Sequence, residues 1–468
     1  MLGENEKAKQ FELIASSTLE RLIPDDHILK RVDRVVDLSW IRDEVRHLYS
    51  EGIGRPSIDP ESALRLMLAG FFQGIVHDRK LMREAQVNLA IRWFAGYEVW
   101  EELPDHSTLS RIRKRWGADL FGEVFRRTVR QCTDAGLVDA ETVHADATLI
   151  RANASWERIA EKYVEDVVRE NDDSGDDAGK PNSGKKGKER ITDPDATLAR
   201  SSPHDKPQPR YKEHMVVDDK SGVVLDVEVT TGRTPEASRL AGQMRRVEEN
   251  AGQRPRAVTA DRGYATGRNY AELEAMGIEA VIPARRVPKQ GGSLTVDEFH
   301  YDANKDIVIC PAGKIMRRGS KYKDNGWYYR GNASVCRKCK LRQRCVSSTA
   351  LTRKVLIVDG HDALIRARGV DLRRDPEKLN MLKRHKWLAE GRHAEAKTQH
   401  GLARAVRRGL EQVAIQAFLT MAVINLKRLA TASIEGFMLL RGFQIIISRF
   451  RFMCRDKHPF FCIPSLRQ

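Results

Sequence analysis

The sequence predicts an α/β fold, preceded by a region that is helical throughout. Two short β-prone runs, 143–146 and 257–261, each end in an acid, and helical segments lie between and after them. Between these runs, 211–217 and 223–230 alternate apolar and polar residues around the turn 218–222, which is typical of a β-hairpin. Strands interspersed with helices along one chain favour an α/β sheet.

The composition suits a cytosolic protein of two or three domains. The chain has 468 residues, which is too long for one ordinary core, and 41% of them are hydrophobic and 31% charged. No apolar run approaches the length of a membrane span, and the start does not resemble a signal peptide. We therefore expect a cytoplasmic location, near the nucleoid, and no membrane partner.

The net charge indicates what kind of partner the protein binds, and the cysteine count indicates whether disulfide bonds are expected. Lys and Arg number 81 against 65 Asp and Glu, a formal charge of +16. Such an excess favours a polyanion such as nucleic acid, although a solvated basic surface would give the same count. Seven cysteines are an odd number in a chain expected in the cytosol, so a disulfide framework is not expected.

Helical patterns dominate the first predicted domain, 1–137. A strong helix start follows residue 56, where Asp59 can cap the helix and Pro60 fits its first turn. Further helices are expected over 79–93, 108–116 and 120–135. The segment 104–115 combines capping residues with hydroxyl and basic groups, as a DNA-recognition helix would, or as an ordinary surface helix would. Its candidate DNA contacts are Ser107, Thr108 and Arg111.

The next predicted domain, 138–286, holds the two acids that end strands. Asp146 follows one β-prone run, and Asp261 follows the other, just before a turn at Gly263. In open α/β sheets such strand ends hold ligands. A mobile insertion is expected at about 162–209, since it is rich in Asp, Gly, Lys, Ser and Pro. Helices are expected over 235–250 and 270–276, and a strand over 277–283.

A basic, loop-rich segment, 287–360, carries a group of cysteines. One Cys-x-x-Cys pair and two further thiols suit tetrahedral zinc, or the thiols are reduced and merely packed by the surrounding strands. The candidate ligands are Cys310, Cys336, Cys339 and Cys345.

A long helical region is expected from 376 to 429, with interruptions at its glycines, within a final catalytic segment 361–430. Glu390 and Lys397 are seven residues apart and therefore share one helical face. If Glu390 packs against the same sheet as Asp146 and Asp261, the three acids would hold two divalent ions, Mg²⁺ or Mn²⁺, about 4 Å apart. The tail, 431–468, has no assignment, and its last part, 441–468, mixes Phe, Ile and Arg without a clear period.

The ordered motifs resemble bacterial insertion-sequence transposases of the DDE type, close to the IS1182 group among the IS4/IS5-like relatives. Residues 146–154 resemble the first-acid motif and 260–264 the second. Glu390, six intervening residues and Lys397 match the third-acid signature. The helical start, the cysteine group, Gly401-Leu402 and the stretch 408–410 are also similar.

The resemblance implies an RNase H-like catalytic fold, with the cysteine segment inserted before the last helices. It implies binding of terminal inverted repeats, hydrolytic release of a 3′ hydroxyl and its transfer to target DNA. The expected partners are DNA and, in the DNA complex, a second copy of the chain. One structural zinc is expected beside the two catalytic ions. The implied DNA contacts are Arg262, Tyr264, Lys397 and Arg408.

Three alternatives remain open at this stage. Lys383 and Lys386 stand where the family often has tyrosine and arginine, so Glu395 is a rival third acid, although Leu402 and not lysine lies seven residues beyond it. The whole chain could instead be a metal-dependent nuclease without strand transfer. It could also be a catalytically inactive, zinc-containing regulator that only binds DNA.

Overall fold

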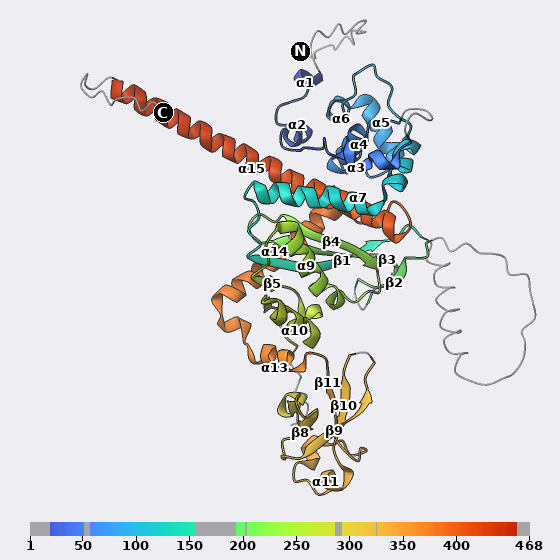
Figure 1. Ribbon diagram of the computed structural model, residues 1–468, viewed down its shortest axis with the longest axis vertical. Coiled ribbons are helices and arrows are strands. Elements are labelled where there is room, and N and C mark those ends of the chain that lie inside the picture. Colours follow the sequence, from blue (N-terminus) through green and yellow to red (C-terminus); the bar gives the residue numbers. More distant parts are fainter. Residues whose placement is uncertain are drawn as a thin grey trace, which may run out of the picture. The chain divides into compact units, whose positions relative to one another are not determined.

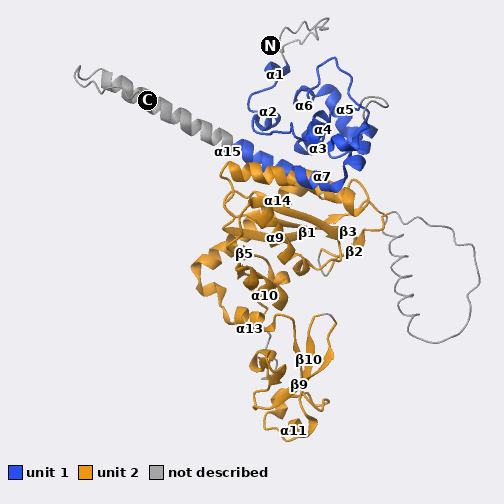
Figure 2. Ribbon diagram, in the orientation of Figure 1, with its two compact units in different colours: residues 1–124, 399–401, 422–468 blue, residues 125–398, 402–421 orange. Residues whose placement is uncertain are grey.

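The computed structural model describes two compact units, coloured separately in Figure 2. Unit 1 spans Met1–Val124, Gln399–Gly401 and Ala422–Gln468, and unit 2 spans Phe125–Thr398 and Leu402–Met421. The residues that the structure describes are 19–50, 57–154, 193–201, 204–285, 293–323 and 325–455, with side chains as far as 432.

The described part of unit 1 is built from helices, as the sequence predicts. Helix α4 begins where expected, because the Asp59 carboxylate accepts a hydrogen bond from the Ser62 amide at 3.0 Å and Pro60 occupies the first turn. The helices and helical turns of this stretch are α1 (Leu19–Leu22), α2 (Ile28–Asp33), α3 (Ile41–Val45), η1 (Arg46–Leu48), α4 (Pro60–Phe72), α5 (Asp78–Val87), α6 (Leu89–Phe94) and the beginning of α7 (His106–Asp134).

Two helix boundaries in this region differ from those expected. The predicted helix 79–93 is divided into α5 and α6, because the Asn88 side chain accepts hydrogen bonds from the amides of Ala90 and Ile91 and so caps a new helix. The two helices predicted over 108–116 and 120–135 are joined within α7, and Gly117 interrupts it with φ 73° and ψ 171°. These torsion angles lie outside the helical region, which explains why the sequence pattern separates the two parts.

A six-stranded mixed sheet forms the centre of unit 2 (Figure 1). Strand β3 pairs antiparallel with β1 on one side and with β4 on the other, so the predicted hairpin is confirmed. On its other edge β1 pairs parallel with β5, which pairs parallel with β6. The strands are β1 (Thr142–Arg151), β2 (Thr197–Ala199), β3 (Gln208–Asp218), β4 (Val224–Thr231), β5 (Ala257–Thr259) and β6 (Glu279–Val281).

Asp146 lies in the middle of β1 and does not end the strand, which corrects the sequence prediction. Hydrogen bonding to β3 keeps β1 extended as far as Arg151, and Asp146 is paired with Met215. The parallel pairing with β5 stops earlier, at His144 opposite Thr259. Asp146 therefore lies two residues beyond the point where the parallel neighbour ends.

Helices follow the sheet strands in sequence. The predicted helix 235–250 is a short turn, η2 (Glu236–Ser238), followed by α9 (Leu240–Ala251). The predicted helical region 376–429 consists of two helices, because Gly401 and Gly409 take left-handed φ values of 72° and 88° between them. The interruption expected at Gly391 is absent, since α14 continues through that residue. Outside the cysteine-bearing segment, the other helical elements of unit 2 are η3 (Arg262–Tyr264), α10 (Gly267–Met276), α13 (His361–Gly369), η5 (Leu372–Arg374), α14 (Pro376–Gln399) and α15 (Leu410–Arg455).

The cysteine-bearing segment contains a second sheet, whereas the sequence indicated mainly loops. Five antiparallel strands are ordered β11-β10-β9-β8-β7. Their buried face is apolar and includes Val308, Met316, Tyr329 and Val355. The elements are η4 (Val296–Glu298), β7 (His300–Asp302), β8 (Ile307–Ile309), β9 (Ile315–Lys321), β10 (Trp327–Arg330), α11 (Ala333–Arg337), α12 (Arg342–Cys345) and β11 (Lys354–Ile357).

A close backbone approach joins the starts of α10 and α13. Gly360 has φ 71°, and a Cβ atom there would lie 2.1 Å from the Gly267 carbonyl oxygen. We expect Gly360→Ala to lower the free energy of unfolding by about 3 kcal/mol, since it adds both backbone strain and a clash. Gly369→Ala is the matched control at the other end of α13, where nothing lies within 4 Å of an added Cβ. Equal urea-unfolding midpoints for the two variants would contradict this account.

Helix α15 corrects two expectations. Its stretch Leu410–Ala432 has the length and hydropathy of a membrane span, but 78% of the most apolar window is buried inside the protein, as in the core helix of a folded domain. Val413 and Ala417 are fully buried, which confirms the predicted apolar spacing. The helix also continues to Arg455, into the stretch 441–468 for which the sequence showed no period. Residues 456–468 lie outside the described part of the chain.

The predicted insertion is only partly within the described residues. Residues 155–192 lie outside them, as do residues 1–18 of the predicted N-terminal domain. The later part of 162–209 rejoins the sheet earlier than expected, because β2 pairs antiparallel with the beginning of β3. Asp193 fixes this return, since its carboxylate accepts a hydrogen bond from the Tyr211 hydroxyl at 2.5 Å.

Candidate active site

Asp146 and Asp261 lie near each other at the place where strand β5 ends beside β1. Asp261 follows β5, as predicted, and its carboxylate accepts a hydrogen bond from the Gly263 amide at 2.6 Å, which caps η3. Asp146 is mostly buried, and burial raises the pKa of its carboxyl group. Nearby Asp261 and Glu236 raise this pKa further, and His393 opposes them. A mostly buried acid, Asp146, therefore lies near two better-solvated ones, since Asp261 is exposed and Glu236 is partly buried.

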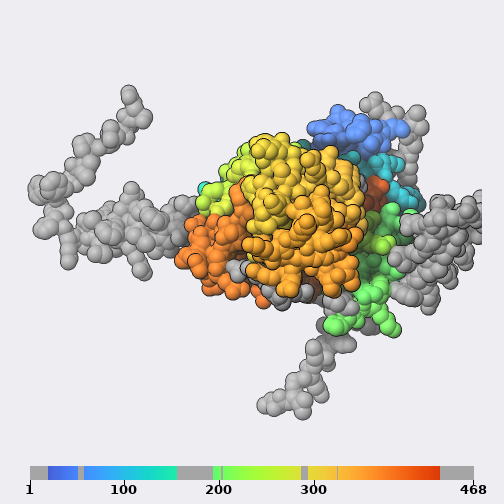
Figure 3. Space-filling model, turned by 90° about the horizontal axis from the view of Figure 1, so that it is seen from below, coloured from blue at the N-terminus to red at the C-terminus, as the bar shows by residue number. Residues whose placement is uncertain are grey.

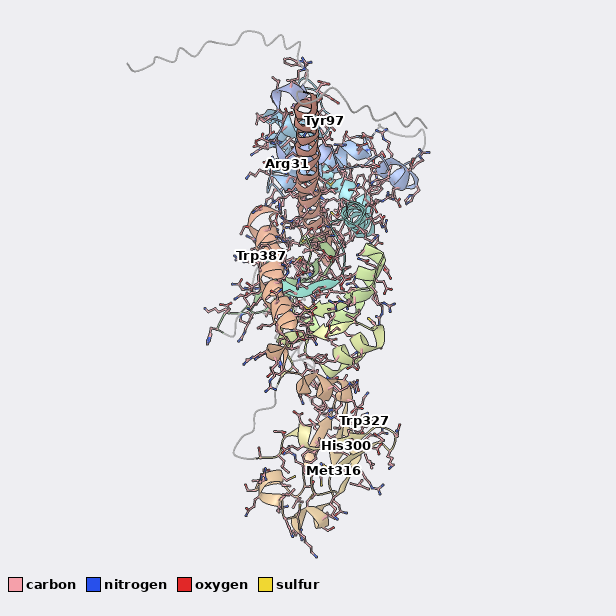
Figure 4. The ribbon with its side chains drawn as sticks, turned by 90° about the vertical axis from the view of Figure 1, so that its left-hand side faces the viewer. Arg31, Tyr97, His300, Met316, Trp327 and Trp387 are labelled. Carbon is pink, nitrogen blue, oxygen red and sulfur yellow. The ribbon has the colours of Figure 1, made fainter. Side chains whose placement is uncertain are left out.

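Helix α14 brings further polar side chains to this site. His393 Nε2 lies 3.6 Å from Asp146 Oδ2, and Lys397 Nζ donates a hydrogen bond to Thr148 Oγ1 at 2.5 Å. Nearer the start of α14, the His385 ring lies 2.9 Å from the hydroxyl of Thr259 on β5. The helix is thus held against both central strands, and Figure 4 shows it alongside the sheet.

Glu390 lies on α14 between these contacts and is exposed. It is three residues before His393 and seven before Lys397, so it shares their side of the helix. The rival acid, Glu395, lies on a different side of the helix. It forms an ion pair with Arg392 at 2.8 Å, and Arg392 packs at Gly222, in the turn between β3 and β4. The helical position therefore favours Glu390 over Glu395 as the partner of the two aspartates.

Sequence reasoning missed two buried residues of this site, Glu213 and His393. Glu213 on β3 is completely buried, and its Oε2 lies 3.2 Å from His393 Nδ1. Burial alone would lower the pKa of His393, but Glu213 and Asp146 outweigh it and the net shift is upward. The sequence feature that could have identified Glu213 is its place in the alternating pattern of β3. It stands at a position that faces the core, as Tyr211 and Met215 two residues away do.

Glu236, at the start of η2, was also missed. Its carboxylate forms an ion pair with Lys212 at 3.1 Å, and Glu236 Oε2 would lie 3.5 Å from a Cβ placed on Gly263. Trp387, one turn before Glu390, is a further unpredicted side chain near this candidate third acid. It is 70% exposed and is labelled in Figure 4.

Tyr264 does not occupy the position expected of a DNA contact. The side chain is fully buried, and its hydroxyl makes no hydrogen bond to the described residues. Burial raises its pKa well above the ordinary value, and the charges of Asp146, Glu236 and Asp261 act in the same direction. The hydroxyl therefore belongs to the acidic cluster. Arg262, beside it in sequence, is exposed as expected.

Basic residues line cavities on either side of the acids. Beyond Lys397 along β1, a cavity of about 390 Å³ is lined by Arg151, Lys206 and Arg404. Arg408 lies near this end of β1, where its guanidinium donates to the Asn153 carbonyl at 3.0 Å. A cavity of about 640 Å³ on the other side includes four arginines, Arg262, Arg285, Arg368 and Arg373.

The predicted recognition helix is the beginning of α7, in unit 1. Asp105 accepts a hydrogen bond from the Ser107 amide at 2.8 Å, and bonds from Ser107 lower the pKa of Asp105 to about 2. Arg111 is exposed, whereas Arg113 is buried in an ion pair with Asp78. Thr108 is partly buried.

All four predicted zinc ligands line one cavity of about 140 Å³. Backbone amides donate to two of the sulfurs, from Lys314 to Cys310 Sγ and from Leu341 to Cys339 Sγ, each at 3.4 Å. Burial raises the pKa of the Cys345 thiol, and the other three thiols add to the effect. Among the described residues, however, no three or more His, Cys, Asp or Glu side chains are grouped closely enough to hold a metal ion. The cavity contains Cys310, Cys336, Cys339 and Cys345.

Comparison with known proteins gives two family matches. A transposase domain model (DUF772) matches residues 17–115, and a transposase DDE domain model matches residues 309–430. The second match contains Glu390 and Lys397 and begins after both aspartates. None of the curated proteins compared with the chain matches it.

Solved transposase structures are similar only distantly. The piggyBac transposase synaptic complex with hairpin DNA is 11% identical, with 93% of this chain and 82% of that chain covered and a TM-score of 0.35. The Mos1 strand transfer complex is 14% identical, with 50% and 60% covered and a TM-score of 0.16. The Mos1 mariner paired end complex with Mn is 13% identical, with 52% and 64% covered and a TM-score of 0.16.

Proposed function

The chain belongs to the DDE-type insertion-sequence transposases, and from this premise we propose that Asp146, Asp261 and Glu390 are its catalytic acids. As a DNA transposase it cleaves and transfers DNA strands. The observation that carries the assignment is the stripe on α14: His393 contacts Asp146, Lys397 contacts Thr148, and Glu390 lies on the same side of the helix.

The arrangement of the six-stranded sheet supports an RNase H-like catalytic domain. Its order β4-β3-β1-β5-β6 has antiparallel strands on one side of β1 and parallel strands on the other. The first acid then lies on the central strand, the second follows the parallel neighbour β5, and the third lies on a late helix.

The carboxylates at this site are of the kind that binds divalent cations, although no three of the described acids are grouped closely enough in this structure to hold an ion. Asp146, Asp261 and Glu236 lie close enough to raise the pKa of Asp146, and the Tyr264 hydroxyl is left without a hydrogen bond among them. A mostly buried carboxylate such as Asp146 beside other acids is costly unless a cation neutralises it. Asp146, Asp261 and Glu390 would hold two Mg²⁺ or Mn²⁺ ions, which would supply an activated oxygen nucleophile and charge on the leaving oxygen.

The chain's own side chains would position the DNA strand. Burial lowers the pKa of Lys397, Arg210 adds to that shift, and Glu213 and Asp146 oppose it. The partly buried ammonium would contact a DNA phosphate. Arg262 and Arg408 would contact the backbone on either side of the acids. The Glu213–His393 pair would hold Asp146 in place from behind.

We propose that the cysteines of this cavity bind one structural zinc. Four thiols in one cavity with two backbone N–H···S bonds provide the donor set and the outer hydrogen bonds that such sites use. The proposed ligands are Cys310, Cys336, Cys339 and Cys345.

DNA ends are the proposed partner of the helical region as well. Ser107, Thr108 and Arg111 at the start of α7 would contact terminal inverted repeats, since a helix N-terminus with hydroxyl and basic groups suits phosphate binding. Two copies would assemble on a pair of ends. The enzyme would act in the cytoplasm, at the nucleoid.

Substitution of Glu390 tests the assignment of the third acid. With DNA that carries the element's own ends and Mg²⁺, Glu390→Gln should lower the cleavage rate about a thousandfold or more, equivalent to about 4 kcal/mol, because it removes a metal ligand. DNA binding should be retained in a gel-shift assay.

Glu395→Gln is the matched control on the same helix. It should keep cleavage and lose some stability, because Arg392 loses its partner. The reverse result would make Glu395 the third acid. Wild-type protein that binds the ends without cutting them would support the regulator, and cutting without joined products would support the nuclease.

A further inference from the structure

The outer face of the five-stranded sheet carries a row of cations. Arg317 on β9 is paired with Arg330 on β10, and Arg330 is paired with Lys354 on β11. Directly paired residues of antiparallel strands project from the same face with Cβ atoms about 5 Å apart. The three side chains therefore form one row across three strands, about 10 Å long. We call Arg317, Arg330 and Lys354 the cation row.

The row faces away from the core of its sheet. The residues next in sequence, Met316, Tyr329 and Val355, are buried on the opposite face. Because side chains alternate along a strand, the cation row lies on the outer face, and all three of its residues are exposed. Figure 3 shows this segment, yellow to orange, at the surface of the protein.

Contacts within the described residues account for only one of the three cations, Lys354, which lies over the Tyr328 ring. None of the three forms an ion pair with a described carboxylate, although Arg318, beside the row, pairs with Asp306. Like charges directly opposite each other destabilise a sheet. A row of this kind is therefore explained better by a polyanion outside the chain than by the stability of the fold.

Aromatic side chains accompany the row on the same face. Lys354 Nζ lies 3.9 Å from the centroid of the Tyr328 ring, and Tyr322 packs edge-on against Tyr328 at 5.4 Å. The segment 293–360 as a whole contains fourteen Lys and Arg against six Asp and Glu. Basic groups interleaved with aromatic rings are typical of surfaces that bind nucleic acid.

We propose that the cation row is a second DNA-contacting surface of this transposase, which binds the phosphate backbone of duplex DNA outside the catalytic site. The proposal rests on the proposed function, since it assumes that the enzyme holds DNA ends at the acids of the other sheet. Contacts to phosphates carry no base information, so the surface adds affinity and orientation and leaves sequence recognition to other parts of the chain.

The test compares two triple variants of the full-length protein. Arg317→Ala/Arg330→Ala/Lys354→Ala removes the row, and Arg337→Ala/Lys338→Ala/Lys340→Ala removes three exposed cations from the neighbouring cysteine loops with the same change in charge. Binding of a fluorescent duplex of arbitrary sequence is measured as salt is raised. Thermal unfolding and metal content are measured for both variants.

Loss of the row should weaken DNA binding at low salt about tenfold or more and reduce the slope of log K against log salt by about 3, one for each phosphate contact. The folded protein should be about as stable as the wild type, because relief of the repulsion between the cations offsets the lost contact of Lys354 with Tyr328. The cysteine-loop variant should keep most of both binding and slope.

Several outcomes would overturn the proposal. Equal losses in the two variants would show a simple effect of net charge. Unchanged DNA binding by the row variant, with cleavage of DNA ends intact, would refute the second DNA-contacting surface but not the proposed function. Unchanged DNA binding with loss of self-association would make the row a contact between copies. Wild-type protein that neither binds nor cleaves DNA would defeat the proposed function itself.

Discussion

Asp146→Asn is expected to abolish cleavage of DNA ends and to make the metal-free protein more stable. The rate should fall about a thousandfold or more, because asparagine cannot supply the charge that holds the divalent ions. Stability should rise by about 1 kcal/mol at neutral pH, because a mostly buried carboxylate beside Asp261 and Glu236 is replaced by a neutral group. Isothermal unfolding in urea with EDTA measures the gain.

The pH dependence gives this prediction a sign. Burial, Asp261 and Glu236 raise the pKa of Asp146 in the folded state, despite the opposing charge of His393. A raised acid pKa costs stability at pH values above it and costs nothing below the unfolded value of 3.8, where the group is protonated in both states. The advantage of Asp146→Asn should therefore be largest near neutral pH and shrink as the pH approaches 4.

Mg²⁺ provides the internal control. The ion should raise the stability of wild-type protein in proportion to the logarithm of its concentration and leave Asp146→Asn nearly unchanged. Cleavage that survives in the variant, or a variant less stable than the wild type at neutral pH without metal, would contradict the role given to Asp146.

Cys339→Ser is expected to release one zinc ion per chain and to unfold the segment 293–360. A structural zinc contributes roughly 10–16 kcal/mol of binding free energy in small domains, and the short strands here surround a modest apolar core. Metal content by mass spectrometry and tryptic cleavage within the segment are the two measurements. Cleavage should rise sharply in the variant and after treatment of the wild type with a strong chelator.

Cys132→Ala is the matched control for loss of a cysteine. Cys132 is fully buried in α7, and burial raises its pKa to about 12. The thiol therefore stays protonated, whereas a zinc ligand is a thiolate. This variant should keep its zinc. Wild-type protein that contains no metal, with a segment equally resistant to trypsin after Cys339→Ser, would establish the four thiols as unliganded.

Local patterns predicted much of the catalytic domain. The hairpin of β3 and β4, the strand before Asp261 and the apolar stripe of α15 all follow from side-chain alternation or helical spacing. The placement of Asp146 did not follow, because the length of β1 is set by its antiparallel partner, and pairing with a distant strand leaves no mark in a short run such as 143–146.

The inner residues of the site could not be read from the sequence for a related reason. Glu213 and His393 are 180 positions apart and acquire a role only when β3 and α14 pack together. The resemblance implied that Tyr264 contacts DNA, yet the side chain, in the turn η3, is fully buried. Whether a side chain at a turn points in or out depends on the fold around it.

The three contacts of α14 have a consequence for how this enzyme can change. His385 meets β5, His393 meets Asp146, and Lys397 meets Thr148, so the helix takes its register from the sheet and not from the chain that leads into it. These contacts, rather than the chain between β6 and α14, would then set the position of Glu390, the proposed third acid. Within that connection the five-stranded sheet segment, 293–357, is free to be lengthened, shortened or replaced over evolution, whereas α13 is tied to α10 by the close approach at Gly360.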